Sequence, residues 1–307
     1  MPKGITVPKS TTGTTDAPRA AETLPPLPHR PDRLAIVIPM YQEAARIAPT
    51  VADVLATLHG WSLPAQLVLV DDGSTDGTSE VARRAIHDAG PAADAADWVQ
   101  TRVLPHERNR GKGAAVRTGL AAAIETGADW ALMMDADNAA RLREIRWLLP
   151  HARGIAPAAT ADFVIASRAT PDADVRAVAS RKLTGLAFRA ALGCMGLRLA
   201  RDTQCGFKLY SARAARLVLE HAQEDRYAFD IEHIALCRRA GLGVAEIGVT
   251  WRHVDGSSIS PVRDGLKMLR EARRIATRLR TLDVAAPDEA RSELEAKPAG
   301  EPTRIGA

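Results

Sequence analysis

Residues 66–78 have the sequence QLVLVDDGSTDGT: an apolar run that ends in two adjacent carboxylates and a turn rich in Asp, Gly and Ser. A strand with one face in water alternates apolar and polar residues, and residues 67–70 do not alternate. A strand that is apolar on both faces belongs inside a sheet covered by helices on both sides. The stretch therefore predicts a buried strand followed by a polar turn.

Similar apolar runs recur along the chain and alternate with longer segments of helical character. The expected strands are 34–40, 66–70, 102–106, 130–137 and 162–167, and the expected helices are 43–58, 76–87, 112–126 and 141–149. Strands joined by crossover helices lie parallel to one another. We therefore predict an α/β fold, a single domain whose doubly wound, mostly parallel sheet carries helices on both faces.

The two ends of the chain differ from this core in composition. Residues 1–33 are rich in proline and threonine without any aromatic side chain, and residues 283–307 carry an excess of acidic residues with scattered Pro and Gly. Neither segment can bury enough apolar surface to offset its ordering entropy. We expect disordered tails at 1–33 and 283–307 around a single domain at 34–282.

The charge, the aromatic content and the cysteines exclude several kinds of protein. The formal net charge is +4 and aromatic residues make up 4%, so the non-enzyme alternative, a basic anion- or nucleic-acid-binding module, lacks the stacking residues it would use, and we predict no nucleic-acid partner. The three cysteines have no metal-ligand or disulfide spacing and fit a reducing compartment. No segment reaches the roughly 18 uncharged apolar residues of a membrane span. We expect a cytoplasmic protein without a transmembrane segment.

Ligands of open parallel sheets bind beyond the carboxyl ends of the strands, so the residues that follow each apolar run decide the chemistry. The first run ends in PMYQE at 39–43, which lacks the glycines of a dinucleotide-binding fingerprint, and Gly111-Lys112 lacks the rest of a P-loop. These absences argue against NAD enzymes and P-loop NTPases. A nucleotidyltransferase would need a glycine-rich basic loop after the first strand, and PMYQE is not such a loop.

Two pairs of acidic residues follow predicted strands. A turn and a helix cap explain Ser74 to Thr78, but Asp71 and Asp72 end a buried strand, where an unpartnered carboxylate is costly, so we predict that at least one of them holds a ribose or a base. Asp135 and Asp137 stand two apart and can point to one side. Such oxygen ligands suit Mg²⁺ or Mn²⁺, which would bridge a diphosphate, although a solvated turn would show the same residues.

Four segments together resemble a known family. VIPMYQE, VDDGSTDGT, NRGKGAAVRTG and MMDAD stand in the order and spacing of family 2 glycosyltransferases, and the resemblance covers residues 34–282. On its own, NRGKG at 109–113 is typical either of a phosphate-facing loop or of a glycine-punctuated helix entry. Farther on, DTQCGFKLY, YAFDIE and SISPVRDGLKMLR look most like the dolichyl-phosphate β-glucosyltransferase branch.

This resemblance implies a GT-A fold and the transfer of glucose from UDP-glucose, with inversion, to a polyprenyl or dolichyl phosphate. It implies that the nucleoside is held by Pro39, Tyr41, Glu43 and Asp71, that the metal and diphosphate are held by Asp135 and Asp137, and that Lys112 lies close by. We add Asp72 to the donor-binding candidates from its place at the strand end. Members of the branch usually carry an N-terminal membrane anchor, which this sequence does not show, and related mannosyltransferases have a polar residue where Ala139 stands.

The acceptor side is expected in the second half of the chain. Arg168, Arg176 and Arg181 are the candidates for the acceptor phosphate, because a guanidinium fork suits a phosphate and Arg168 follows an apolar run; each could also be an ordinary surface base. Asp230, in YAFDIE at the start of an expected helix, is the candidate catalytic residue, whereas Glu232 is interpreted as a helix-dipole or surface partner. A phosphate acceptor is already anionic, whereas a soluble hydroxyl acceptor, the alternative, would need a carboxylate base.

The expected helix at 262–282 has two interpretations. It carries seven basic and two acidic residues around a regular apolar stripe. A solvated helix that packs this stripe on the core is the usual meaning. The same bases would also form a face for anionic lipid headgroups, which would place the protein peripherally on the cytoplasmic face of a membrane.

Overall fold

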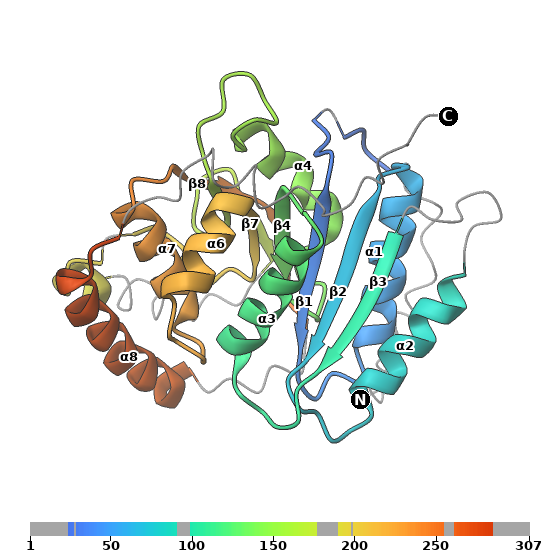
Figure 1. Ribbon diagram of the computed structural model, residues 1–307, viewed down its shortest axis with the longest axis horizontal. Coiled ribbons are helices and arrows are strands. Elements are labelled where there is room, and N and C mark those ends of the chain that lie inside the picture. Colours follow the sequence, from blue (N-terminus) through green and yellow to red (C-terminus); the bar gives the residue numbers. More distant parts are fainter. Residues whose placement is uncertain are drawn as a thin grey trace, which may run out of the picture.

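The computed structural model describes residues 24–27, 29–90, 99–176, 190–197, 199–254 and 261–284, with the backbone alone for 176 and 261–266. The chain alternates strands and helices as far as β5, and beyond β5 the strands β6 to β9 and the helices α6, α7 and α8 follow in a less regular order (Figure 1). The elements are β1 Leu34–Met40, α1 Ile47–Gly60, β2 Ala65–Asp71, α2 Thr78–Ala89, β3 Val99–Pro105, α3 Lys112–Glu125, β4 Trp130–Met134, η1 Leu142–Glu144, α4 Ile145–Leu148, η2 Leu149–His151, β5 Phe163–Ser167, β6 Asp174–Arg176, β7 Phe207–Ser211, α6 Ala212–His221, α7 Phe229–Arg239, β8 Val244–Gly248, β9 Thr250–Arg252 and α8 Pro261–Thr281.

Seven strands form one sheet in the order β3-β2-β1-β4-β7-β5-β8. The pairs β3-β2, β2-β1, β1-β4 and β5-β8 are parallel, and β7 runs antiparallel to both of its neighbours. The predicted α/β fold with a mostly parallel sheet is confirmed. The antiparallel β7 was not predicted, because FKLYS is a short run whose direction no local pattern fixes.

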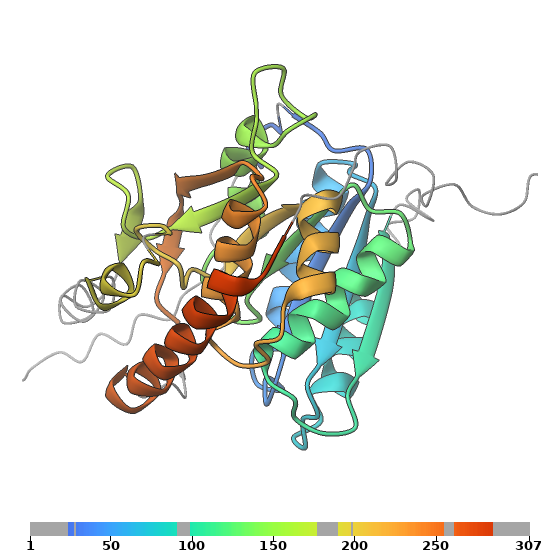
Figure 2. The same ribbon diagram turned by 60° about the vertical axis from the view of Figure 1, so that its left-hand side comes forward.

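Alternate side chains of the strands feed two cores, one on each face of the sheet. Ala35 and Val37 pack in the core that also takes residues from α3, α6, α7 and α8, and Ile36 and Ile38 pack in the core with α1 and α4. Figure 2 shows α8 on the outer side of the helices that cover this first face of the sheet, beside α7. This two-sided burial is why the central strands β1 and β4 are continuously apolar, whereas the edge strand β3 is only partly buried and carries polar residues.

The second half of the chain departs in detail from the expected elements. The apolar segment GVAEIGVTW at 243–251 predicts a single strand, but it is divided between β8 in the main sheet and β9, which pairs with β6 in a separate two-stranded sheet. The expected helix at 262–282 is confirmed as α8, and its residues Ala272, Ile275 and Leu279 are buried in the core. The helix therefore packs an apolar stripe against the domain.

Part of the expected N-terminal tail packs on the domain. Leu24 and Leu27 contact the core on the α1 side, and the carbonyl of Pro25 accepts a hydrogen bond of 2.8 Å from Trp61 Nε1. The composition of residues 1–33 as a whole predicted a disordered tail, because two leucines have little effect on an average over 33 residues. The rest of that tail before residue 24, and the C-terminal tail after Val284, lie outside the described residues. None of the helices in the described ranges combines the length and the apolar character that a bilayer span requires.

Candidate active site

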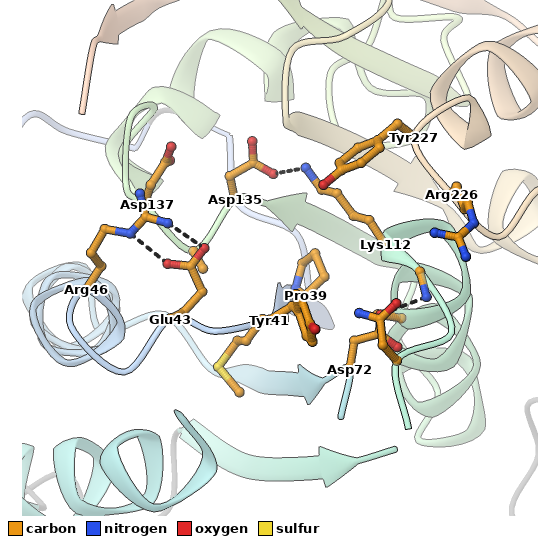
Figure 3. A pocket seen from close by; sticks show the side chains of 15 residues that line it. Pro39, Tyr41, Glu43, Arg46, Asp72, Lys112, Asp135, Asp137, Arg226 and Tyr227 are labelled. Atoms are coloured by element: carbon orange, nitrogen blue, oxygen red, sulfur yellow. Dashed lines mark hydrogen bonds and ion pairs between the residues drawn. The ribbon is translucent and has the colours of Figure 1, made fainter. Parts of the chain in front are cut away.

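A pocket of about 300 Å³ opens at the carboxyl ends of β1, β2 and β4 (Figure 3). The start of α3 and the loop 222–228, between α6 and α7, complete its wall. The lining residues are Pro39, Met40, Tyr41, Glu43, Arg46, Asp72, Asn109, Gly111, Lys112, Ala115, Asp135, Ala136, Asp137, Arg226 and Tyr227. Six of the seven predicted donor-binding residues, all except Asp71, and both predicted metal ligands are therefore brought together.

Asp135 and Asp137 lie side by side beyond β4. Asp137 accepts a hydrogen bond of 3.0 Å from the backbone N–H of Ala139, and Asp135 forms an ion pair of 2.5 Å with Lys112. Burial and the charge of Asp135 raise the pKa of Asp137, so this carboxylate is ionised at a cost that a cation would relieve. Two adjacent carboxylates of this kind fit a hard divalent cation.

The protein supplies only part of the coordination that such a cation needs. No group of three or more His, Cys, Asp or Glu side chains in the described ranges is arranged to hold a metal ion. Mg²⁺ is typically bound by one or two carboxylates together with water and substrate phosphates. The Asp135–Asp137 pair is therefore suited to a cation that arrives with, or is completed by, an anionic ligand.

Lys112, the first residue of α3, brings a positive charge to the pocket. Burial by itself would lower the pKa of Lys112, but the carboxylates of Asp135 and Asp230 outweigh burial and raise it above the ordinary value. Lys112 thus stays protonated and places a fixed positive charge beside the acidic pair.

Glu43 and Arg46 form the opposite wall at the start of α1 (Figure 3). Arg46 donates from Nε and Nη2 to the two carboxylate oxygens of Glu43, at 2.8 and 2.9 Å. Burial raises the pKa of Glu43, while Arg46 opposes that shift. Tyr41, which lines the pocket, is 47% exposed, and a planar group could stack on its ring.

The neighbouring carboxylates of Asp71 and Asp72 have partners within the chain itself. Asp71 accepts from the N–H of Ser74 at 3.0 Å and from Ser79 Oγ at 2.5 Å, and it does not line the pocket. Asp72 lines the pocket and accepts from the N–H groups of Arg110 and Gly111 at 2.9 and 2.7 Å. Protein donors therefore meet the desolvation cost that we had used to predict a ligand there, and the nucleoside roles of both residues stay predictions.

Asp230 lies in the first turn of α7, as predicted, but behind the pocket wall rather than on it. Its carboxylate is buried and forms an ion pair of 2.6 Å with Lys208, which is itself fully buried in β7. Burial raises the pKa of Asp230, and Lys208 and Lys112 oppose that shift. Asp230 can thus act on the pocket through its electrostatic effect on Lys112, which raises the pKa of that lysine.

The three arginines predicted for the acceptor phosphate differ in what surrounds them. Arg168 follows β5 and is not among the residues that line the pocket; its Nε and Nη2 donate to Asp202 at 2.7 and 3.0 Å, which leaves Nη1 as the nitrogen that Asp202 does not engage. Its guanidinium lies 5.5 Å from the ring centroid of Trp251. Arg176 ends β6, and Arg181 lies outside the described residues.

Some residues at the site were missed by the sequence analysis or were interpreted wrongly. Arg46, Arg226 and Tyr227 line the pocket and were not predicted. The i,i+3 spacing of Arg46 from Glu43 could have indicated the first residue, and the position of Arg226 and Tyr227 directly before the AFD segment could have indicated the other two. Glu232 is not a surface residue: it is 1% exposed and accepts from two backbone N–H groups and from Arg278.

The sequence of the chain is similar to a known protein family and to several characterised proteins. The model of the family described as Glycosyl transferase family 2 matches residues 35–217. Dolichyl-phosphate beta-glucosyltransferase of Drosophila melanogaster is 32% identical over 81% of this chain and 76% of its own length. The protein of that name in Homo sapiens is 30% identical over 80% of this chain and 76% of its own length, and the one in Saccharomyces cerevisiae is 29% identical over 78% and 72%.

Solved structures share the fold at lower identity. Glucosyl-3-phosphoglycerate synthase from Mycobacterium tuberculosis in complex with UDP superposes with a TM-score of 0.57 at 21% identity, covering 82% of this chain and 81% of that one. Mannosyl-3-phosphoglycerate synthase from Rubrobacter xylanophilus gives 0.57 at 19% identity, over 89% and 78%. The fold is thus the GT-A architecture of these enzymes.

Proposed function

The chain belongs to glycosyl transferase family 2, and from this premise we propose that it transfers glucose from UDP-glucose, with inversion, to a polyprenyl phosphate such as dolichyl phosphate. The observation that carries the proposal is one pocket in which Asp135, Asp137 and Lys112 meet the predicted donor-binding residues at the strand ends. The relatives named above, at about 30% identity over most of the chain, support the same sugar and acceptor.

The donor side of the pocket divides into a nucleoside part and a diphosphate part. Pro39, Tyr41 and Glu43 would hold the nucleoside, with Asp72 fixing the backbone of the loop that faces it. Asp135 and Asp137 would hold Mg²⁺ or Mn²⁺. A cation bound there would stabilise the negative charge that develops on the departing nucleoside diphosphate.

The acceptor phosphate needs positioning more than activation. A phosphate monoester has a second pKa near 6 and is already an anionic nucleophile at neutral pH. Arg168, together with Arg176 and Arg181, would receive it, because a guanidinium fork suits a phosphate. Asp230, paired with Lys208 behind the wall, would set the position of Lys112 rather than take a proton.

A membrane-bound acceptor requires contact with a lipid surface. Within α8 the bases Lys267, Arg270, Arg273 and Arg280 are exposed, whereas Arg278 is turned inward to Glu232. The apolar stripe packs on the core, so any lipid contact through this helix would be electrostatic and peripheral.

A product assay tests this proposal and separates it from the alternative of a soluble hydroxyl acceptor. The protein is incubated with UDP-glucose, UDP-galactose or GDP-mannose, with Mg²⁺ or Mn²⁺, and with either a short polyprenyl phosphate or the matching polyprenol. The proposal expects release of UDP from UDP-glucose that depends on the phosphorylated acceptor. Release that the polyprenol supports equally well would overturn the phosphate acceptor, and release of GDP alone would overturn the donor.

A further inference from the structure

The loop 222–228 forms one wall of the pocket and is held from the side away from it. Buried Glu232 accepts hydrogen bonds from the N–H groups of Gln223 and Glu224 at 2.9 and 2.8 Å. Arg117 of α3 donates to the carbonyl of Glu224 at 2.7 Å and pairs with Asp225. The backbone of the loop is therefore fixed by charged groups before any ligand arrives.

Two glycines of the NRGKG segment allow this loop to lie directly on the start of α3. A Cβ at Gly111 would lie 2.3 Å from the carbonyl oxygen of Asp225, and a Cβ at Gly113 would lie 2.4 Å from that of Glu224. The N–H of Ala114 donates to the same Asp225 carbonyl at 3.1 Å. The two glycines are therefore needed because they let the loop pack closely on the backbone at the start of α3, in addition to any role in beginning the helix.

Arg226, in the middle of this fixed loop, differs from the other cations that line the pocket. Lys112 is paired with Asp135 and Arg46 with Glu43. The side chain of Arg226 is exposed and lines the pocket. Within the part of the chain that the structure describes it makes no ion pair within 4 Å, although its positive charge has a lowering effect on the pKa of Glu271 in α8. Figure 3 shows Arg226 across the pocket from the Glu43–Arg46 pair.

We propose that Arg226 binds a phosphate group of a substrate in this pocket. The inference rests on the proposed function, which requires the pocket to hold a nucleotide diphosphate and an acceptor phosphate. A guanidinium fork is suited to phosphate oxygens, and the backbone that carries it has no ordering cost left to meet on binding because the loop is already in place. Phosphate chemistry is common to both substrates, so the experiment identifies which of them Arg226 contacts.

The test compares Arg226→Gln and Arg226→Lys with Arg84→Gln, a matched control in which an exposed arginine of α2, outside the pocket lining, is changed. Titration calorimetry measures the Kd of UDP in the presence of Mn²⁺. Steady-state kinetics at saturating donor then give the KM for a short polyprenyl phosphate. Thermal unfolding of each variant reports whether the fold is kept.

Loss of a charge-assisted hydrogen bond to a ligand weakens the affinity for that ligand by about tenfold or more. A contact to the donor raises the UDP Kd of Arg226→Gln by that factor and leaves the acceptor KM unchanged; a contact to the acceptor does the reverse. In either case Arg226→Lys lies between the wild type and Arg226→Gln, and Arg84→Gln matches the wild type. Unchanged Kd and KM in Arg226→Gln overturn this inference alone, whereas a wild-type protein that neither binds UDP nor transfers glucose overturns the proposed function with it.

Discussion

Gly206 lies directly against the carboxylate of Asp135: a Cβ atom at position 206 would come within 1.9 Å of Asp135 Oδ2. The carbonyl of Gly206 also accepts a hydrogen bond of 3.0 Å from the N–H of Asp135. The glycine of the CGF segment, far along the chain, therefore leaves the space that one predicted metal ligand occupies.

Gly206→Ala should displace the Asp135 carboxylate and weaken binding of Mn²⁺ in the presence of UDP by about 10–100-fold, as is typical when the support of a metal ligand is lost. Titration calorimetry measures this. Gly243→Ala is a matched control, because its Cβ would clash with the carbonyl of Thr160, outside the pocket lining. It should lower stability and leave Mn²⁺ affinity unchanged. Equal metal affinity in the two alanine variants would contradict this account of Gly206.

Asp137→Ala should abolish glucose transfer while the protein stays folded, because the remaining carboxylate cannot by itself hold the cation that offsets the charge of the leaving diphosphate. The release of UDP, measured with and without EDTA, checks this. Asp88→Ala, an exposed acid of α2, serves as the control. Full activity of Asp137→Ala in EDTA would be incompatible with a metal role for this residue.

Asp230→Asn should slow transfer through lost geometry at Lys112, with a modest fall in kcat when the acceptor is a phosphate. The wild-type kcat should be nearly flat above pH 7, since the phosphate needs no base. With a hydroxyl acceptor the loss would approach the 10²–10⁴-fold range of general-base catalysis. The pH profile of kcat with polyprenyl phosphate decides this. A steep rise on its basic side that disappears in Asp230→Asn would favour a hydroxyl acceptor.

The Arg168–Asp202 pair should make stability depend on pH. Burial by itself would raise the pKa of Asp202, but Arg168 outweighs burial and lowers it. The stabilisation is therefore complete above the unfolded-state pKa of about 3.9 and is lost as the pH falls through the lower folded value.

Asp202→Asn should lower the free energy of unfolding by about 1–3 kcal/mol at pH 7, and the difference from the wild type should shrink at pH 3. Urea denaturation at the two pH values measures both numbers. An equal difference at pH 7 and pH 3 would mean that the ionic part of the pair contributes nothing.

Exposed bases of α8 should bind the protein to anionic vesicles. Changing Lys267, Arg270 and Arg273 together to Gln should weaken co-sedimentation on the order of 100-fold, at about 1 kcal/mol per base. Changing Arg83 and Arg84 of α2, which are also exposed, should have no effect. Equal binding of the wild type to neutral and anionic vesicles would leave α8 as a helix that only packs on the core.

The sequence predicted the first half of the fold because its signals are local. Apolar runs predicted β1, β2, β4, β5 and part of β3, and the acids that follow β2 and β4 mark the pocket. The direction of β7, the burial of Glu232 and the contact of Gly206 with Asp135 depend on segments far apart in the chain, so no local pattern carries them. Asp72 shows a related limit: a buried carboxylate demands donors, but the pattern does not say that the backbone of the loop provides them.

The central claim, glucosyl transfer to a phosphate, is tested most directly by ³¹P NMR of the reaction itself. The wild-type protein, UDP-glucose, Mn²⁺ and a short polyprenyl phosphate are followed over time. We predict that the phosphomonoester signal of the acceptor is replaced by a phosphodiester signal in step with the appearance of UDP, and that neither change occurs with Asp137→Ala. UDP that accumulates while the phosphomonoester signal stays constant would contradict the claim.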